Sequence, residues 1–133
     1  MRLWHYKLIE VLDVKRLLGQ HRECCALRGN GWRKNHSTVD YVFKYHPHCL
    51  FSYHKDVMNQ METRGFNVTQ AWWDKNYRGK NCRPWREDEL ACEDPVEIPY
   101  PEHNKQYLKK CVSLLKKKNY EFYKDLEKKI DAN

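Results

Sequence analysis

The sequence predicts an all-α protein, a small single-domain helical bundle with long connecting loops. Apolar residues recur at helical spacing in three separate stretches. No turn dipeptide stands between two alternating apolar runs, which is the pattern of a β-hairpin. The length of 133 residues is that of one domain, which we expect to cover 1–133. With 41% hydrophobic and 32% charged residues, the composition is globular rather than disordered.

The first predicted helix begins after Asp13, a residue type that caps helix N-termini. We expect its apolar stripe to contain Val14, Leu17, Leu18, His21 and Cys25. On a helical wheel Glu23 then lies about 180° from Val14, so the Glu23 carboxylate is predicted to point away from the core. Taken alone, this pattern indicates a surface glutamate paired with Arg16 or Arg22.

The second predicted helix begins at Pro47, a residue favoured in the first turn. We expect it to stop at Gly65, with Phe66 beyond the stop contacting Met61 as in a Schellman ending. Its stripe contains Leu50, His54, Val57, Met58 and Met61. We interpret His54 as a core histidine with satisfied hydrogen bonds.

The rest of the chain contains one more long helix. Residues 38–44 fit a short helical turn, and 29–31 fit a loop. The third apolar stripe contains Tyr107, Leu108, Cys111, Leu114 and Leu115. Asn119 is the expected break after it. Residues 82–101 are acidic and rich in proline, and we predict an irregular connection there.

The charge distribution indicates a nucleic-acid partner. The formal net charge is +7, and residues 1–81 hold 14 basic against 7 acidic side chains. A basic body binds nucleic acid most simply, because phosphate neutralisation supplies most non-specific affinity. No apolar stretch is long enough to span a membrane, and no export signal is visible, so we expect a cytoplasmic protein without a membrane partner.

The six cysteines contain no C-x-x-C pair, and we expect free thiols. His46, His48 and Cys49 are spaced like metal ligands, but a second ligand pair is missing. We therefore predict neither a metal nor a cofactor.

The run Gly19-Gln20-His21-Arg22-Glu23, with Met1-Arg2-Leu3 at the start, resembles the pyrimidine-dimer DNA glycosylase family of the phage endonuclease V type. Arg64-Gly65-Phe66-Asn67 is similar to a helix ending of the same family. The resemblance covers roughly residues 1–70. It implies a compact all-α enzyme that excises a damaged pyrimidine from double-stranded DNA and then nicks the strand by β-elimination, as an abasic-site lyase.

The resemblance also implies roles for particular residues. The nucleophile would be the α-amine of Met1, which forms a Schiff base with the deoxyribose, and Glu23 would transfer protons. Arg2 and Arg22 would hold phosphates, and we add Arg28, Arg33 and Lys34 as weaker candidates for DNA binding. Arg2 is too large for ordinary methionine excision, so Met1 itself should present the amine. An arginine expected three residues after the glutamate is replaced by Ala26.

Two other functions remain open at this level. One is a non-catalytic nucleic-acid-binding module of the same fold. The other is a helical protein-interaction domain whose basic surface meets an acidic partner. We expect a monomer.

Overall fold

The computed structural model describes residues 2–29, 38–91 and 99–131. Regular structure within these ranges is helical throughout, which confirms the predicted all-α class. The α-helices are α1 Val14–Arg28, α2 Pro47–Thr63, α3 Glu87–Leu90, α4 Lys105–Lys118, α5 Tyr120–Tyr123 and α6 Leu126–Asp131. The 3₁₀ helices are η1 Tyr6–Val11, η3 Asp40–Lys44 and η4 Gln70–Trp73. No described helix is both long and apolar enough to cross a membrane.

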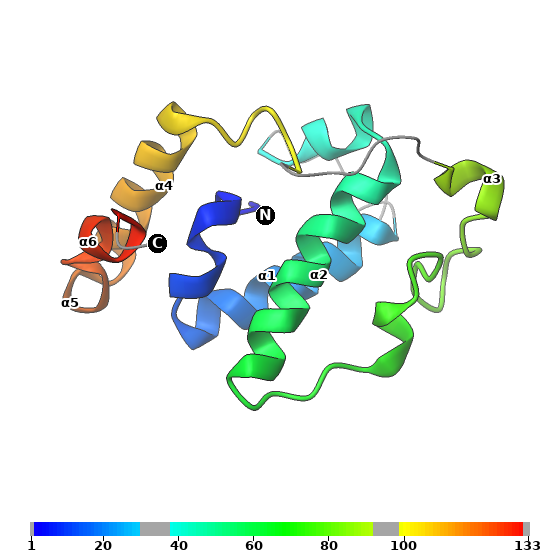
Figure 1. The fold of residues 1–133 in the computed structure, drawn as a ribbon, viewed down its shortest axis with the longest axis horizontal. Coiled ribbons are helices and arrows are strands. Elements are labelled where there is room, and N and C mark those ends of the chain that lie inside the picture. Colours follow the sequence, from blue (N-terminus) through cyan, green and yellow to red (C-terminus); the bar gives the residue numbers. More distant parts are fainter. Residues whose placement is uncertain (1, 30–37, 92–98, 132–133) are drawn as a thin grey trace.

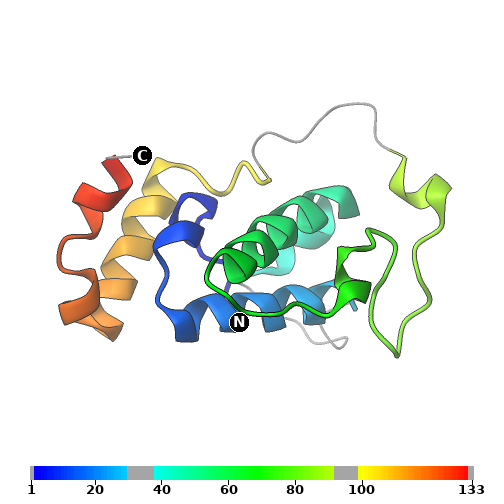
Figure 2. The ribbon, with the colours of Figure 1, turned by 60° about the horizontal axis from the view of Figure 1, so that its bottom comes forward.

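Helices α1 and α2 pack against each other in the middle of the molecule, with α4, α5 and α6 at one end and α3 at the other (Figure 1). The N-terminal segment lies between α4 and the α1–α2 pair in both views (Figure 2). Its residues Leu3, Leu8 and Leu12 are completely buried, and η1 contacts both α2 and α6. This packing holds the N-terminal segment against α2 and α6.

Helix α2 has the boundaries that its sequence predicts. Pro47 is its first residue, and Gly65 adopts a φ of +89° just after its end. The Phe66 N–H donates to the carbonyl of Met61 (3.0 Å) and the Gly65 N–H to that of Glu62 (3.0 Å). These two bonds form the Schellman motif, so the predicted ending is confirmed.

The buried face of α1 differs from the predicted stripe. Val14 is 45% exposed, and the buried side chains are those of Leu17, Gln20, Cys24, Ala26, Leu27 and Arg28. The wheel was oriented wrongly because it left Gln20 and Arg28 out of the core. Polar Gln20 and Arg28 are buried with hydrogen-bond partners, which turns the helix and brings Glu23 to the edge of the core rather than away from it.

The C-terminal part of the chain has the elements that its sequence pattern predicts, except in the acidic connection. Asn119 ends α4 as predicted, and its Oδ1 accepts from the Phe122 N–H (3.2 Å) at the start of α5. The connection over 82–101 is not wholly irregular, because Glu87–Leu90 forms the short helix α3. The Glu89 carboxylate accepts from the Arg86 N–H (2.9 Å), and acidic residues in a first turn favour helix formation.

Candidate active site

The Glu23 carboxylate binds the start of the chain. Its Oε2 accepts from the backbone N–H of Arg2 (3.1 Å) and from the Nε2 of Gln20 (3.0 Å). The same Gln20 nitrogen donates to the Arg2 carbonyl (2.8 Å), so one residue of the N-terminal segment is held at both its peptide groups. The motif residues of α1 and the first residues of the chain therefore meet in space.

Gln20 is itself fixed from within the core. Its Oε1 accepts from the Trp4 N–H (2.9 Å) and from the hydroxyl of Tyr53 on α2 (2.7 Å), and Gln20 is buried. The Tyr53 hydroxyl also lies 2.6 Å from the Trp4 carbonyl. A buried network with all members bonded is rigid. Gln20 belongs to the sequence motif around Glu23, but no role was predicted for it.

The environment of Glu23 changes its protonation. Burial raises the pKa of the Glu23 carboxyl above its ordinary value, while the Arg2 hydrogen bond, the positive N-terminus and Arg22 oppose the rise. Because an efficient proton-transfer group has a pKa near the working pH, this shift suits Glu23 for acid–base chemistry.

The cationic side chains that the sequence predicts to bind DNA lie in different surroundings. The Arg2 guanidinium lies over the rings of Trp4 and Tyr107, and its Nη1 donates weakly to the Tyr107 hydroxyl (3.4 Å). Arg22 is exposed, one position before Glu23. Met1, Arg33 and Lys34 lie outside the described residues.

Arg28 is not placed to contact DNA. Its side chain is 0% exposed, and its guanidinium donates to the carbonyls of Trp72 (2.9 Å), Asp74 (2.7 Å) and Tyr77 (2.7 Å). Burial lowers the pKa of Arg28 to about 10. We therefore replace the sequence-based role of Arg28 in DNA binding with a structural one, because a completely buried side chain offers no surface to a phosphate.

Two buried histidine contacts join α1 to α2. Arg28 Nη1 lies 3.0 Å from His54 Nδ1, and because guanidinium nitrogens only donate, neutral His54 carries its proton on Nε2. That Nε2 then donates to His21 Nδ1 (2.9 Å). The expectation of a core histidine with satisfied hydrogen bonds is confirmed for His54.

His21, Cys25 and His54 place three potential metal ligands within 4.8 Å of one another. Sequence spacing singled out His46, His48 and Cys49 instead, because it cannot show that His54 of α2 lies beside His21 and Cys25 of α1. The donor set fits a metal poorly, since the proton on His54 Nε2 occupies the lone pair that a metal needs. Burial also raises the pKa of the Cys25 thiol to about 12, against the thiolate form. We interpret the group as a hydrogen-bonded histidine pair.

An open cleft of about 730 Å³ lies beside Glu23. Its lining contains Gly19, His21, Arg22, Glu23, Cys25, Ala26, Gly29, Trp72, Arg78, Gly79, Lys80, Asn81 and Cys82. Three cations line it, and among the described residues that do so Glu23 carries the only carboxylate. A mostly positive cleft beside an acid–base group fits a polyanionic substrate that undergoes proton transfer.

Comparison with known proteins gives one finding. No curated protein and no solved structure is similar enough to match the chain. The family model described as pyrimidine dimer DNA glycosylase matches residues 1–74, which include Arg2, Gln20, Glu23 and all of α1 and α2. This match covers more than half of the chain, and it confirms the resemblance carried by the motif around Glu23. The chain therefore belongs to the pyrimidine dimer DNA glycosylase family.

Proposed function

We propose that this protein is a DNA glycosylase with abasic-site lyase activity, which excises a damaged pyrimidine through a Schiff base on the α-amine of Met1. The observation that carries the proposal is the hydrogen bond from the Arg2 peptide N–H to Glu23 (3.1 Å). Met1 is bonded to that peptide nitrogen, and one residue spans only about 3.8 Å between Cα atoms. The amine therefore belongs to the residue next to a peptide group that Glu23 binds.

The chemistry needs a neutral amine and a proton-transfer group together. The amine attacks C1′ of the deoxyribose, the glycosidic bond breaks, and the base leaves. Opening of the sugar ring gives a protonated Schiff base, and loss of a C2′ proton then expels the 3′ phosphate by β-elimination. Glu23 accepts and returns the protons that move in these steps, and its raised pKa favours that role.

An α-amine is a suitable nucleophile near neutral pH. An α-amine has an ordinary pKa of about 7.7–8.0, so a useful fraction is neutral near pH 7. Two guanidiniums accompany it, that of Arg2 in the N-terminal segment and that of exposed Arg22 on α1. The same two groups can hold phosphates on either side of the reacting sugar.

Borohydride trapping tests the proposal directly. Reduction of the reaction with an abasic duplex should link the protein covalently to the DNA, because only a Schiff base is trapped in this way. Acetylation of the α-amine should abolish both trapping and nicking while duplex binding survives. Native nicking by the fully acetylated protein would make a lysine the nucleophile. Duplex binding without any trapping would favour the non-catalytic module.

A further inference from the structure

The cleft beside Glu23 has two walls of different origin. One wall is α1, which lies within the region that matches the family model. The other consists of Arg78, Gly79, Lys80, Asn81 and Cys82, all beyond residue 74, where that match ends. We call these five residues the second wall. Neither the family match nor the motif around Glu23 gives them a function.

The second wall is fixed to the end of α1 from several directions. Arg28 of α1 holds the carbonyls of Trp72, Asp74 and Tyr77, immediately before the wall. In return, Arg78 Nε donates to the Arg28 carbonyl (2.8 Å), and the Cys82 thiol lies 3.5 Å from the Gly29 carbonyl. The wall is therefore built as part of the fold rather than attached as a free loop.

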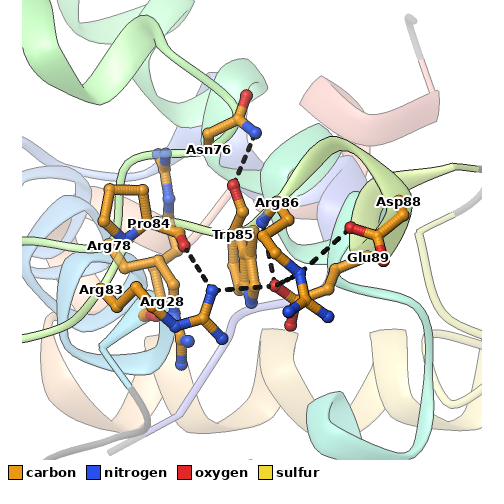
Figure 3. Close-up of polar contacts among 9 residues, drawn as sticks. All are labelled: Arg28, Asn76, Arg78, Arg83, Pro84, Trp85, Arg86, Asp88 and Glu89. Carbon is orange, nitrogen blue, oxygen red and sulfur yellow. Dashed lines mark hydrogen bonds and ion pairs between the residues drawn. The ribbon is translucent and has the colours of Figure 1, made fainter.

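The outer side of this segment is also packed (Figure 3). The Arg78 guanidinium lies over the Trp85 ring, 4.8 Å from its centroid. Asn76 Nδ2 donates to the Trp85 carbonyl (2.7 Å), and the Trp85 N–H donates to the Asn76 carbonyl (2.9 Å). Figure 3 shows Trp85 between Arg78 and the residues that begin α3. These contacts direct Arg78 into the structure and leave Lys80 as the exposed cation of the second wall.

The backbone of the wall makes a turn that presents Lys80. Gly79 has a φ of +97°, a conformation that other residues rarely adopt, and a Cβ added there would lie 3.7 Å from Trp72 Cη2. The turn thus runs close over the Trp72 ring, which also lines the cleft. The positive charges of Arg22 and Lys80 consequently come from opposite walls, with Glu23 on the α1 side.

We propose that the second wall is a DNA-binding element in which Lys80 binds a backbone phosphate of the strand held in the cleft, opposite Arg22. The inference rests on the proposed function for the choice of DNA, a duplex with an abasic site. It adds a substrate contact from beyond residue 74 to a reaction centre that lies wholly before it. Lys80 binds and orients the strand and takes no part in bond making or breaking.

The test is the salt dependence of binding to an abasic-site duplex. Lys80→Gln should lower the magnitude of the log–log salt slope by about 0.9, the value for one phosphate, and weaken binding about eightfold at 0.1 M salt. Lys80→Arg should keep the wild-type slope. The matched control is Lys75→Gln, which removes the same charge from an exposed lysine that pairs with Glu87 outside the cleft. Its slope should not change.

Each outcome decides something. An unchanged slope in Lys80→Gln, or an equal change in Lys75→Gln, overturns the role of the second wall. Borohydride trapping at saturating protein separates this result from the proposed function, because Lys80→Gln should still be trapped. If the wild-type protein is not trapped but Lys80→Gln lowers the slope, the binding wall stands and the lyase chemistry fails. If the wild-type protein does not bind the duplex, both proposals are overturned.

Discussion

The two walls of the cleft are stabilised in different ways. The α1 wall is tied to the core through a side-chain network in which Gln20 joins Tyr53, Trp4 and Glu23. The segment that leads into the second wall is tied through its backbone, because the single side chain of Arg28 holds the carbonyls of Trp72, Asp74 and Tyr77. A side-chain network fixes the position and protonation of a particular group, as catalysis requires. Backbone anchoring of that segment fixes the path of the chain and leaves Lys80 exposed to contact a ligand.

This difference predicts that changes in the Gln20–Glu23 network affect chemistry and that changes in the second wall affect binding. The largest expected effect is a loss of several orders of magnitude in reaction rate. The smallest is a change of less than one unit in the slope of log binding constant against log salt concentration.

The largest effect is expected for Glu23→Gln. Loss of general acid–base help typically lowers a rate about 10²–10⁴-fold, so base release and nicking should fall by that amount. Binding should hold or tighten, because the substitution removes an anion that faces DNA. The melting temperature should be unchanged or higher, since the raised pKa means that burial disfavours the charged Glu23 in the folded state. Normal nicking by this variant would leave Glu23 with only the role of holding the N-terminal segment.

Arg28→Met should cause the largest loss of stability. The three carbonyls that Arg28 holds lose their donor, and an unpaired buried polar group costs roughly 1–3 kcal/mol. We expect the free energy of unfolding, measured by urea titration, to fall by about 3 kcal/mol. Arg64→Met is the matched control, because partly exposed Arg64 also donates to two carbonyls, those of Leu12 and Glu10.

The control should lose about 1 kcal/mol, the net value of an ordinary hydrogen bond. Equal losses in Arg28→Met and Arg64→Met would contradict the special role of Arg28 in holding the second wall. The burial of Arg28 would then be incidental to that wall.

Acid should loosen the N-terminal segment through His5 and His103. Both are buried, and burial lowers the pKa of His5 to about 4 and that of His103 to about 3. Between about pH 6.5 and 4 the unfolded chain therefore binds protons that the folded chain does not. Stability is complete above the ordinary histidine pKa and falls as pH falls, by roughly 1.4 kcal/mol per pH unit for each histidine.

His103 accepts from the Tyr6 N–H (3.1 Å) and pairs with Tyr41, so its protonation breaks contacts beneath the start of the chain. Urea titrations at pH 7 and pH 5 measure the effect. In His103→Gln, the free energy of unfolding should differ less between pH 7 and pH 5 than it does in the wild-type protein. A free energy of unfolding that is equal at pH 7 and pH 5 would show that these histidines are protonated in the folded state.

Local signals in the sequence were enough to predict some elements. Pro47 at the start of α2 and Gly65 at its end act on neighbouring residues, so a reader of the sequence can place both boundaries. Asn119 marks the end of α4 for the same reason. Glu23 was found through its motif, although the helical wheel placed it on the wrong side of the core edge.

The missed features depend on partners far along the chain. The carbonyls that Arg28 holds lie 44, 46 and 49 residues away, and the ring that His21 contacts lies 33 residues away. Neither helical periodicity nor motif spacing contains such distances. The burial of Arg28 brings the second wall to the cleft. A prediction of the position of that wall from the sequence would therefore have required a prediction that Arg28 is buried.

The smallest effect compares one exposed cation from each wall. Arg22→Ala should lower the magnitude of the salt slope by about 0.9, as Lys80→Gln should, with unfolding free energies within about 0.5 kcal/mol of wild type. Because the two cations lie on opposite walls, we expect them to bind different phosphates, so the double variant should lose about 1.8 of the slope. The measurement is made on abasic and undamaged duplexes. A double variant with the slope of either single variant would place both side chains on one phosphate, and the two walls would then form a single phosphate site rather than a groove that follows the strand.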